Sequence, residues 1–208
     1  MIKTVVLLSG RGSNFKALLD ADLPVQFTAV ISNRPDAAGL DYARAQGIPA
    51  ITLNHKSYPT REAFDEVLAK EIDKAGADLV VLAGYMRILT KAFVERYAGR
   101  LINIHPSLLP MFPGLRTHEA ALREGVKIHG CTVHFVTPEL DHGPIIIQAA
   151  VPVLSGDTPD TLASRVLAQE HRIYPQAVRW FAEGKLVISD GRVNIRDDGV
   201  SQWVLSTP

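Results

Sequence analysis

The sequence predicts an α/β fold built on an open, doubly wound and mostly parallel sheet, with an antiparallel C-terminal portion. Short runs of Val, Ile and Leu recur over the first hundred residues, and helix-like segments separate them. This alternation is typical of parallel strands that are buried on both faces. After residue 104 the alternation stops, and two longer apolar segments precede one long helical stretch.

Five strands and four helices are expected before residue 105. The strands cover Ile2 to Leu8, Val25 to Ser32, Ala50 to Leu53, Leu79 to Ala83 and Leu101 to Ile104. The helices cover Asn14 to Asp20, Asp36 to Gln46, Thr60 to Ala75 and Thr90 to Tyr97. Gly47 and Gly76 directly follow the second and third helices, where a helix often ends on a residue with positive φ.

The second half begins with a loop, because Pro106, Pro110 and Pro113 exclude a regular helix or a central strand there. Four further elements are expected beyond it: strands at Ile128 to Thr137 and Ile145 to Val153, a helix from the N-cap Thr158 to about Glu183, and a peripheral hairpin within Lys185 to Pro208. We see no linker or internal repeat, so we expect one domain.

The composition excludes several classes of function. The 208 residues include 22 basic and 22 acidic side chains and a single cysteine, Cys131. Zero net charge removes the long-range field by which nucleic-acid-coating proteins attract phosphates. No apolar run is long enough for a signal peptide or a membrane span. We therefore expect a cytoplasmic protein that binds neither nucleic acid nor a membrane. We also expect no disulfide bond.

The loop after the first strand is the first candidate site. In Ser9-Gly10-Arg11-Gly12-Ser13-Asn14 the two glycines let the backbone turn sharply, and the following helix offers free N–H groups to an anion. The motif lacks the third glycine of a dinucleotide fingerprint and the Gly-Lys-Ser/Thr end of a P-loop. A plain turn is the alternative, but the strand-loop-helix order favours a bound phosphate monoester, with Ser13 and Asn14 as side-chain donors.

Asn103 and His105 form the second candidate site, at the carboxyl end of the fifth strand, where open α/β sheets bind ligands. Residues two apart in extended chain face the same side. An amide beside an imidazole can stabilise a developing oxyanion, and the imidazole can move protons near neutral pH. The alternative is that both side chains only bond to the backbone, but the rigid proline loop that follows favours a functional role.

Asp141 is the third candidate, in the loop Glu139-Leu140-Asp141-His142-Gly143-Pro144. Asp and Gly suit a turn, so an ordinary turn aspartate is the alternative. If the loop folds over His105, the carboxylate could hold the imidazolium form and accept a proton from an attacking amine. Sequence alone leaves open whether the two residues meet.

Two weaker candidates remain. The segment Gly84 to Leu89 offers an apolar strip suited to a flat heterocycle, although apolar residues after a strand are usually core. Gln169-Glu170-His171 could reach a ribose or an amine, although polar triplets on helices are mostly solvated. No metal site is expected, because the histidines lack the helical His-x-x-x-His spacing and the lone cysteine has no partner.

Six motifs follow one another along most of the chain: Ser9 to Asn14, Ala83 to Leu89, Ile102 to Pro110, His134 to Val136, Leu140 to Ile146 and Gln169 to His171. Together they resemble the folate-dependent formyltransferase family, and the Gly-Ser-Asn loop is similar to that of its glycinamide ribonucleotide branch. The resemblance implies a Rossmann-like formyltransferase fold in one domain, with a phosphate-binding half at 1–104 and a catalytic half at 105–208. It also implies a cis bond between Leu109 and Pro110.

The resemblance further implies transfer of the formyl group of the cosubstrate 10-formyltetrahydrofolate to the amine of glycinamide ribonucleotide, in purine biosynthesis and without a metal. The implied catalytic residues are Asn103, His105 and Asp141. Those implied to bind glycinamide ribonucleotide are Gly12, Ser13, Asn14, Pro106 and Glu170. Those implied to bind the folate are Arg61, Met86, Arg87, Ile88, Leu89, Asn103, Thr137, Pro138, Glu139, Leu140 and Asp141. Whether the protein is a monomer or a homodimer stays open.

Several alternatives remain at this point. Formyltetrahydrofolate hydrolase shares the Asn-His-Asp set but uses water as acceptor, and methionyl-tRNA formyltransferase adds a basic C-terminal domain. We expect neither, because Met1 leads directly into the first strand and 208 residues leave no room for a further domain. A nonenzymatic nucleotide-binding module and a nicotinamide dehydrogenase come from other classes. The dehydrogenase is disfavoured because Val30 to Arg34 contains no acidic residue at the end of the second strand.

Overall fold

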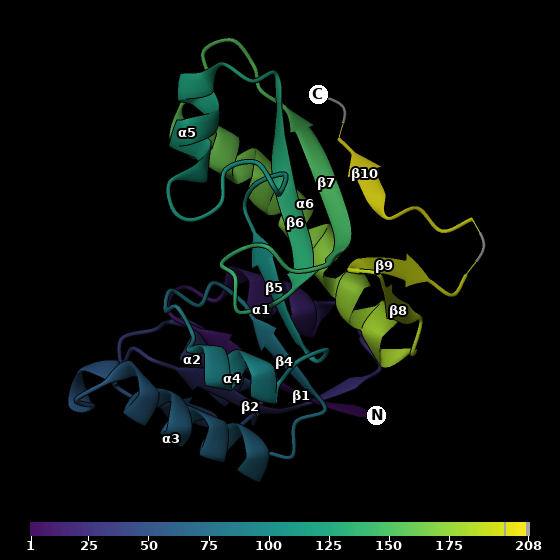
Figure 1. Cartoon of the computed structure of the whole chain (residues 1–208). Coiled ribbons are helices and arrows are strands. Elements are labelled where there is room, and N and C mark those ends of the chain that lie inside the picture. The colour runs from purple at the N-terminus through teal and green to yellow at the C-terminus, as the bar shows by residue number, and fades with distance from the viewer. Residues whose placement is uncertain (198, 207–208) are drawn as a thin grey trace. The chain divides into compact units, whose positions relative to one another are not determined.

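The computed structural model describes residues 1–197 and 199–206 (Figure 1). The chain divides into two compact units, Met1–Asn103 and Ile104–Pro208. Among the described residues, no helix is both long enough and apolar enough to cross a membrane.

The first unit contains a parallel sheet in the order β3-β2-β1-β4-β5. The strands are β1 Ile2–Leu8, β2 Val25–Ser32, β3 Ala50–Thr52, β4 Leu79–Leu82 and β5 Leu101–His105, of which β5 runs into the second unit. Val5 to Leu8 of β1 and all four residues of β4 are buried, as expected of strands covered on both faces.

The connections between these strands are helical. They are α1 Ser13–Asp20, α2 Gly39–Ala45, the 3-10 turn His55–Ser57, α3 Arg61–Lys74 and α4 Lys91–Arg96. Threonine hydroxyls cap two of them: Thr60 accepts from the Ala63 N–H at the start of α3, and Thr90 accepts from the Phe93 N–H at the start of α4. Each cap satisfies a backbone donor that the helix itself leaves without a partner.

The strand order places a topological switch point between β1 and β4. From β1 the chain proceeds outward through β2 and β3, and it then returns to the other side of β1 through β4 and β5. Ligands of open α/β sheets bind outside the carboxyl ends of the strands at such a point. The segments that leave β1 and β4 there are 9–13 and 84–90, which both contain candidate site residues.

The second unit is built on an antiparallel pair. Its elements are α5 Thr117–Glu124, β6 Ile128–Phe135, β7 Ile145–Pro152, α6 Pro159–Ala182, β8 Leu186–Ser189, β9 Arg192–Ile195 and β10 Trp203–Leu205. β6 pairs antiparallel with β7, β10 pairs parallel with β7, and β8 and β9 form a separate hairpin. α6 packs against β6 and β7 (Figure 1) and begins with a reciprocal capping box between Thr158 and Thr161.

The predicted fold class is confirmed, including the antiparallel C-terminal portion, the Thr158 cap and the tail hairpin. Several boundaries and elements differ from the prediction. α2 begins at Gly39 rather than Asp36, and β6 ends at Phe135 rather than Thr137. α5 and β10 were not predicted, and residues 198 and 207–208 of the tail lie outside the described part.

Candidate active site

The loop after β1 packs closely on the start of α2. Gly12 has φ +77°, and a side chain there would meet the Gly39 Cα at 2.6 Å. The Gly39 N–H donates to the Gly10 carbonyl at 3.0 Å. α1 begins at Ser13, and the Asn14 side chain on its first turn is buried. Gly12 and Gly39 therefore allow the loop to lie against α2, and the loop leads into Ser13 and Asn14 at the amino end of α1.

The segment after β4 is irregular and exposes apolar side chains. We call residues 84–90 the strip. Met86 and Ile88 are 68% and 59% exposed, while Tyr85 between β4 and Met86 is 9% exposed. The alternative that apolar residues after a strand are core is therefore wrong for Met86 and Ile88. The strip is joined to β1 by Ser9, whose N–H donates to the Gly84 carbonyl and whose hydroxyl accepts from the Met86 N–H.

Arg61, at the first position of α3, lies on the strip. Its guanidinium donates to the Ile88 carbonyl at 2.8 Å. Arg87 of the strip contacts α3 in turn, since its guanidinium lies 4.6 Å from the centre of the Phe64 ring. The fold therefore brings together three of the residues implied to bind the folate, namely Arg61, Arg87 and Ile88. In the sequence, 26 positions separate Arg61 from Arg87.

In the second unit, His105 meets Asp141. The His105 Nδ1 lies 3.6 Å from the Asp141 Oδ2, and the two side chains are only 7% and 10% exposed. Asp141 also accepts a hydrogen bond from the Gly114 N–H at 2.8 Å, and its backbone has φ +52°. Because the loop of Asp141 does fold over His105, the open question of whether these residues meet is answered.

The contact of the other ring nitrogen shows which nitrogen of the His105 ring carries a hydrogen. Its Nε2 lies 3.0 Å from the Phe112 carbonyl, which can only accept, so Nε2 donates. The Nδ1 faces the Asp141 carboxylate and becomes a second donor when the ring is protonated. The Phe112 carbonyl and the Asp141 carboxylate therefore hold the ring from both of its nitrogens.

The proline loop that supplies the Phe112 carbonyl is held by side chains of the antiparallel pair. The Thr132 hydroxyl donates to the Ser107 carbonyl and accepts from the Leu109 N–H, and Gln148 donates to the Leu109 carbonyl. The Leu109-Pro110 peptide is cis, as the resemblance implied. Thr117 donates to the carbonyl of Pro106 at 2.6 Å. These supporting residues lack a sequence signal, because each is an ordinary strand or helix residue until the fold is known.

A pair of histidines lies beside this loop. The His118 Nδ1 is 3.2 Å from the His129 Nε2, and the His129 ring packs edge-on against Phe112. Burial lowers the pKa of His129 to about 4, and it also lowers the pKa of His118. His105 makes a smaller electrostatic contribution to both shifts, in the same direction. Both rings are consequently neutral near pH 7.

Five further predicted residues occupy two places in the second unit. In the loop 137–140, Pro138, Glu139 and Leu140 are exposed, and the Thr137 hydroxyl donates to the Glu139 carbonyl. Glu170 on α6 is 7% exposed, so the alternative of a solvated polar triplet is wrong for this residue. Its charge, together with burial, raises the pKa of the Cys131 thiol and of the Tyr174 hydroxyl.

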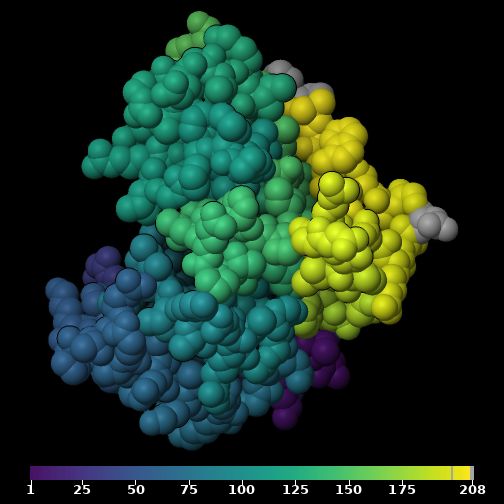
Figure 2. All heavy atoms as spheres, viewed as in Figure 1, coloured from purple at the N-terminus to yellow at the C-terminus, as the bar shows by residue number. Residues whose placement is uncertain are grey.

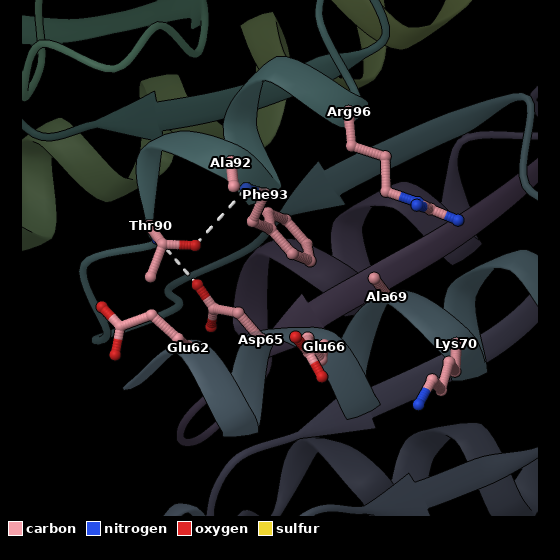
Figure 3. Close-up of a pocket in the computed structure, with 9 residues that line it drawn as sticks. All are labelled: Glu62, Asp65, Glu66, Ala69, Lys70, Thr90, Ala92, Phe93 and Arg96. Carbon is pink, nitrogen blue, oxygen red and sulfur yellow. Dashed lines mark hydrogen bonds between the residues drawn. The ribbon is translucent and has the colours of Figure 1, made fainter. Parts of the chain in front are cut away.

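A pocket of about 390 Å³ lies between α3 and α4 in the first unit (Figure 3). In the space-filling view, α3 and α4 form part of the surface of that unit, in blue to blue-green (Figure 2). None of the residues predicted for the site lines this pocket. The described residues contain no group of three or more His, Cys, Asp or Glu arranged to hold a metal ion.

Comparison with known proteins identifies the class. The formyl transferase family model matches residues 2–178, so the chain belongs to the formyl transferase family, as predicted. Phosphoribosylglycinamide formyltransferase of Escherichia coli is 54% identical over 186 residues, which are 88% of each chain.

Solved structures agree with this assignment. The glycinamide ribonucleotide transformylase 1 of Symbiobacterium toebii is 53% identical, with a TM-score of 0.93 over 95% of both chains. The phosphoribosylglycinamide formyltransferase of Coxiella burnetii is 46% identical, with a TM-score of 0.91 over 98% of both chains. The predicted enzyme class is confirmed: the protein is a formyl-group transferase.

Proposed function

We propose that the protein transfers the formyl group of 10-formyltetrahydrofolate to the primary amine of glycinamide ribonucleotide, giving N-formylglycinamide ribonucleotide and tetrahydrofolate. The observation that carries the chemistry is the buried His105-Asp141 pair with 3.6 Å between Nδ1 and Oδ2. The names of the relatives support the acceptor, since they are phosphoribosylglycinamide formyltransferases.

The reaction needs a group that stabilises negative charge on the formyl oxygen. The amine nitrogen attacks the formyl carbon, a new C–N bond forms, and the bond to the folate N10 breaks. Asn103 and protonated His105 stand on the same strand, two residues apart, and we assign both to the formyl oxygen. Removal of one such donor typically lowers the rate about 10²- to 10³-fold.

The reaction also moves a proton. The attacking amine loses a proton as the C–N bond forms, and the departing folate nitrogen gains one. We assign this transfer to Asp141, acting directly or through a water molecule, while the same carboxylate faces the His105 ring. The hydrogen bond from the Gly114 N–H holds the carboxylate at the required place.

The two substrates are assigned to different segments. The amino end of α1 with Gly12, Ser13 and Asn14 suits the phosphate, because its N–H groups and dipole favour an anion. The exposed apolar side chains of Met86 and Ile88 suit the flat ring of the folate.

The remaining assignments follow the family resemblance. We add Pro106 and Glu170 to the glycinamide ribonucleotide site, and Arg61, Arg87, Leu89 and the loop 137–141 to the folate site. We further propose that both units together make one formyltransferase domain, because one catalytic strand, β5, continues from the first into the second.

The test is an acceptor-dependence assay. Purified protein is incubated with 10-formyltetrahydrofolate, with and without glycinamide ribonucleotide, and loss of the formyl group from the folate is followed by absorbance. We expect turnover only with the acceptor. Equal turnover without it would assign the protein to formyltetrahydrofolate hydrolysis instead.

A further inference from the structure

One face of α3 holds the strip in place. The strip has neither helical nor strand hydrogen bonding of its own, so its conformation depends on partners outside it. Arg61, Phe64 and Asp65 are spaced i, i+3 and i+4, which places them on one face of the helix. Arg61 contacts the Ile88 carbonyl, Phe64 the Arg87 guanidinium, and Asp65 the Thr90 N–H, all of which belong to the strip.

Asp65 makes the contact at the end of the strip. Its Oδ2 accepts a hydrogen bond from the Thr90 N–H at 2.7 Å, and the residue is only 4% exposed. Figure 3 shows the Asp65 side chain pointing from α3 to Thr90, on the wall of the pocket between α3 and α4. A charge-assisted bond to a buried carboxylate is among the stronger single contacts in a protein. It fixes the point at which the strip ends and α4 begins.

We propose that Asp65 is a positioning residue for the formyl donor, acting through the strip; this inference rests on the folate assignment made under the proposed function. Asp65 does not touch the ligand. It holds Thr90, and through it the turn on which Met86 and Ile88 present their apolar side chains. Loss of this bond leaves the strip tied by Ser9, Arg61, Arg87 and the cap that Thr90 makes on α4, and it leaves the part-buried Thr90 N–H without its acceptor.

The distinguishing readout is a change in donor binding alone. We expect Asp65→Ala to raise the KM for 10-formyltetrahydrofolate about fivefold to tenfold, with the KM for glycinamide ribonucleotide and kcat within twofold of wild type. Asp65→Asn keeps an oxygen that accepts from the Thr90 N–H, so we expect it to restore donor binding to within twofold of wild type. Glu66→Ala is the matched control, since Glu66 lines the same pocket on the same helix and is exposed.

Binding of tetrahydrofolate by titration calorimetry separates this inference from the proposed function. If the wild-type protein does not bind tetrahydrofolate, the proposed function is wrong. If wild type binds it and Asp65→Ala binds it equally well, the positioning role of Asp65 is wrong. An equal rise of both KM values, or a fall of kcat alone, also overturns it. Asp65→Ser, with a shorter polar side chain that cannot span to Thr90, replaces the alanine variant if that variant does not fold, and the same fivefold to tenfold loss is expected.

Discussion

Replacement of Asp141 by Asn isolates the charge of the catalytic pair. Asn retains an oxygen that accepts from the Gly114 N–H, and it tolerates the left-handed backbone at φ +52°, so the fold is preserved. In the proposed mechanism, the variant loses the attraction between a carboxylate and an imidazolium whose Oδ2 and Nδ1 lie 3.6 Å apart. At an effective dielectric constant of about 20 that attraction is about 4 to 5 kcal/mol, which corresponds to about 10³-fold in kcat.

The assay is steady-state formyl transfer with both substrates saturating, together with the Kd of tetrahydrofolate. We expect kcat to fall about 10³-fold and the Kd to change less than threefold. Asp190→Asn is the matched control, because Asp190 also has positive φ, at +50°, but lies exposed in the β8-β9 turn. A kcat for Asp141→Asn within tenfold of the control would refute the role of the carboxylate charge.

Three further predictions follow from the same geometry. In Gly39→Ala the new methyl would lie 3.0 Å from the Gly12 Cα, so we expect the KM for glycinamide ribonucleotide to rise about tenfold with kcat nearly unchanged; an unchanged KM would contradict the phosphate assignment. Asn103→Ala should lower kcat about 10²- to 10³-fold in the same transfer assay, and a smaller effect than tenfold would remove it from the oxyanion site. The folded-state pKa of His129, about 4, is below its ordinary value of 6.5, so the unfolded state binds more protons between these values. The free energy of unfolding should therefore be retained above about pH 6.5 and fall by up to about 3 kcal/mol as the pH drops toward 4, and urea titrations of His129→Gln should show a shallower fall than wild type.

The parallel half of the fold could be predicted because its strands are buried on both faces. β1 and β2 have the predicted limits, since each ends in a short buried apolar run, Val5 to Leu8 in β1 and Ala29 to Ile31 in β2. α2 starts three residues later than predicted, because Gly39 lies against the Gly12 loop while Arg34 and Asp36 form an ion pair before it.

The missed elements carry weak local patterns. α5 buries only Thr117 and Ala121, so it lacks the apolar stripe that marks a helix, and it begins after Arg116 with φ +56°. β10 has three residues and depends on its pairing with β7, which is remote in sequence. Neither could be recognised without the tertiary partner.

The candidate site was predicted in its chemical groups but not in its contacts. His105 and Asp141 are 36 positions apart, and local pattern contains no information about whether two such loops meet. The Thr132 and Asp65 side chains act on backbone groups far away in sequence, so their residue types alone gave no signal. The burial of Glu170 likewise depends on how α6 packs against β6 and β7.

The most direct test of the account follows the formyl carbon itself. The donor is labelled with ¹³C at the formyl group, incubated with glycinamide ribonucleotide and the protein, and the products are observed by NMR. We predict that the label leaves the folate and arrives in the formamide of N-formylglycinamide ribonucleotide, in a one-to-one ratio with tetrahydrofolate. Label that arrives in free formate instead would contradict direct transfer to the amine.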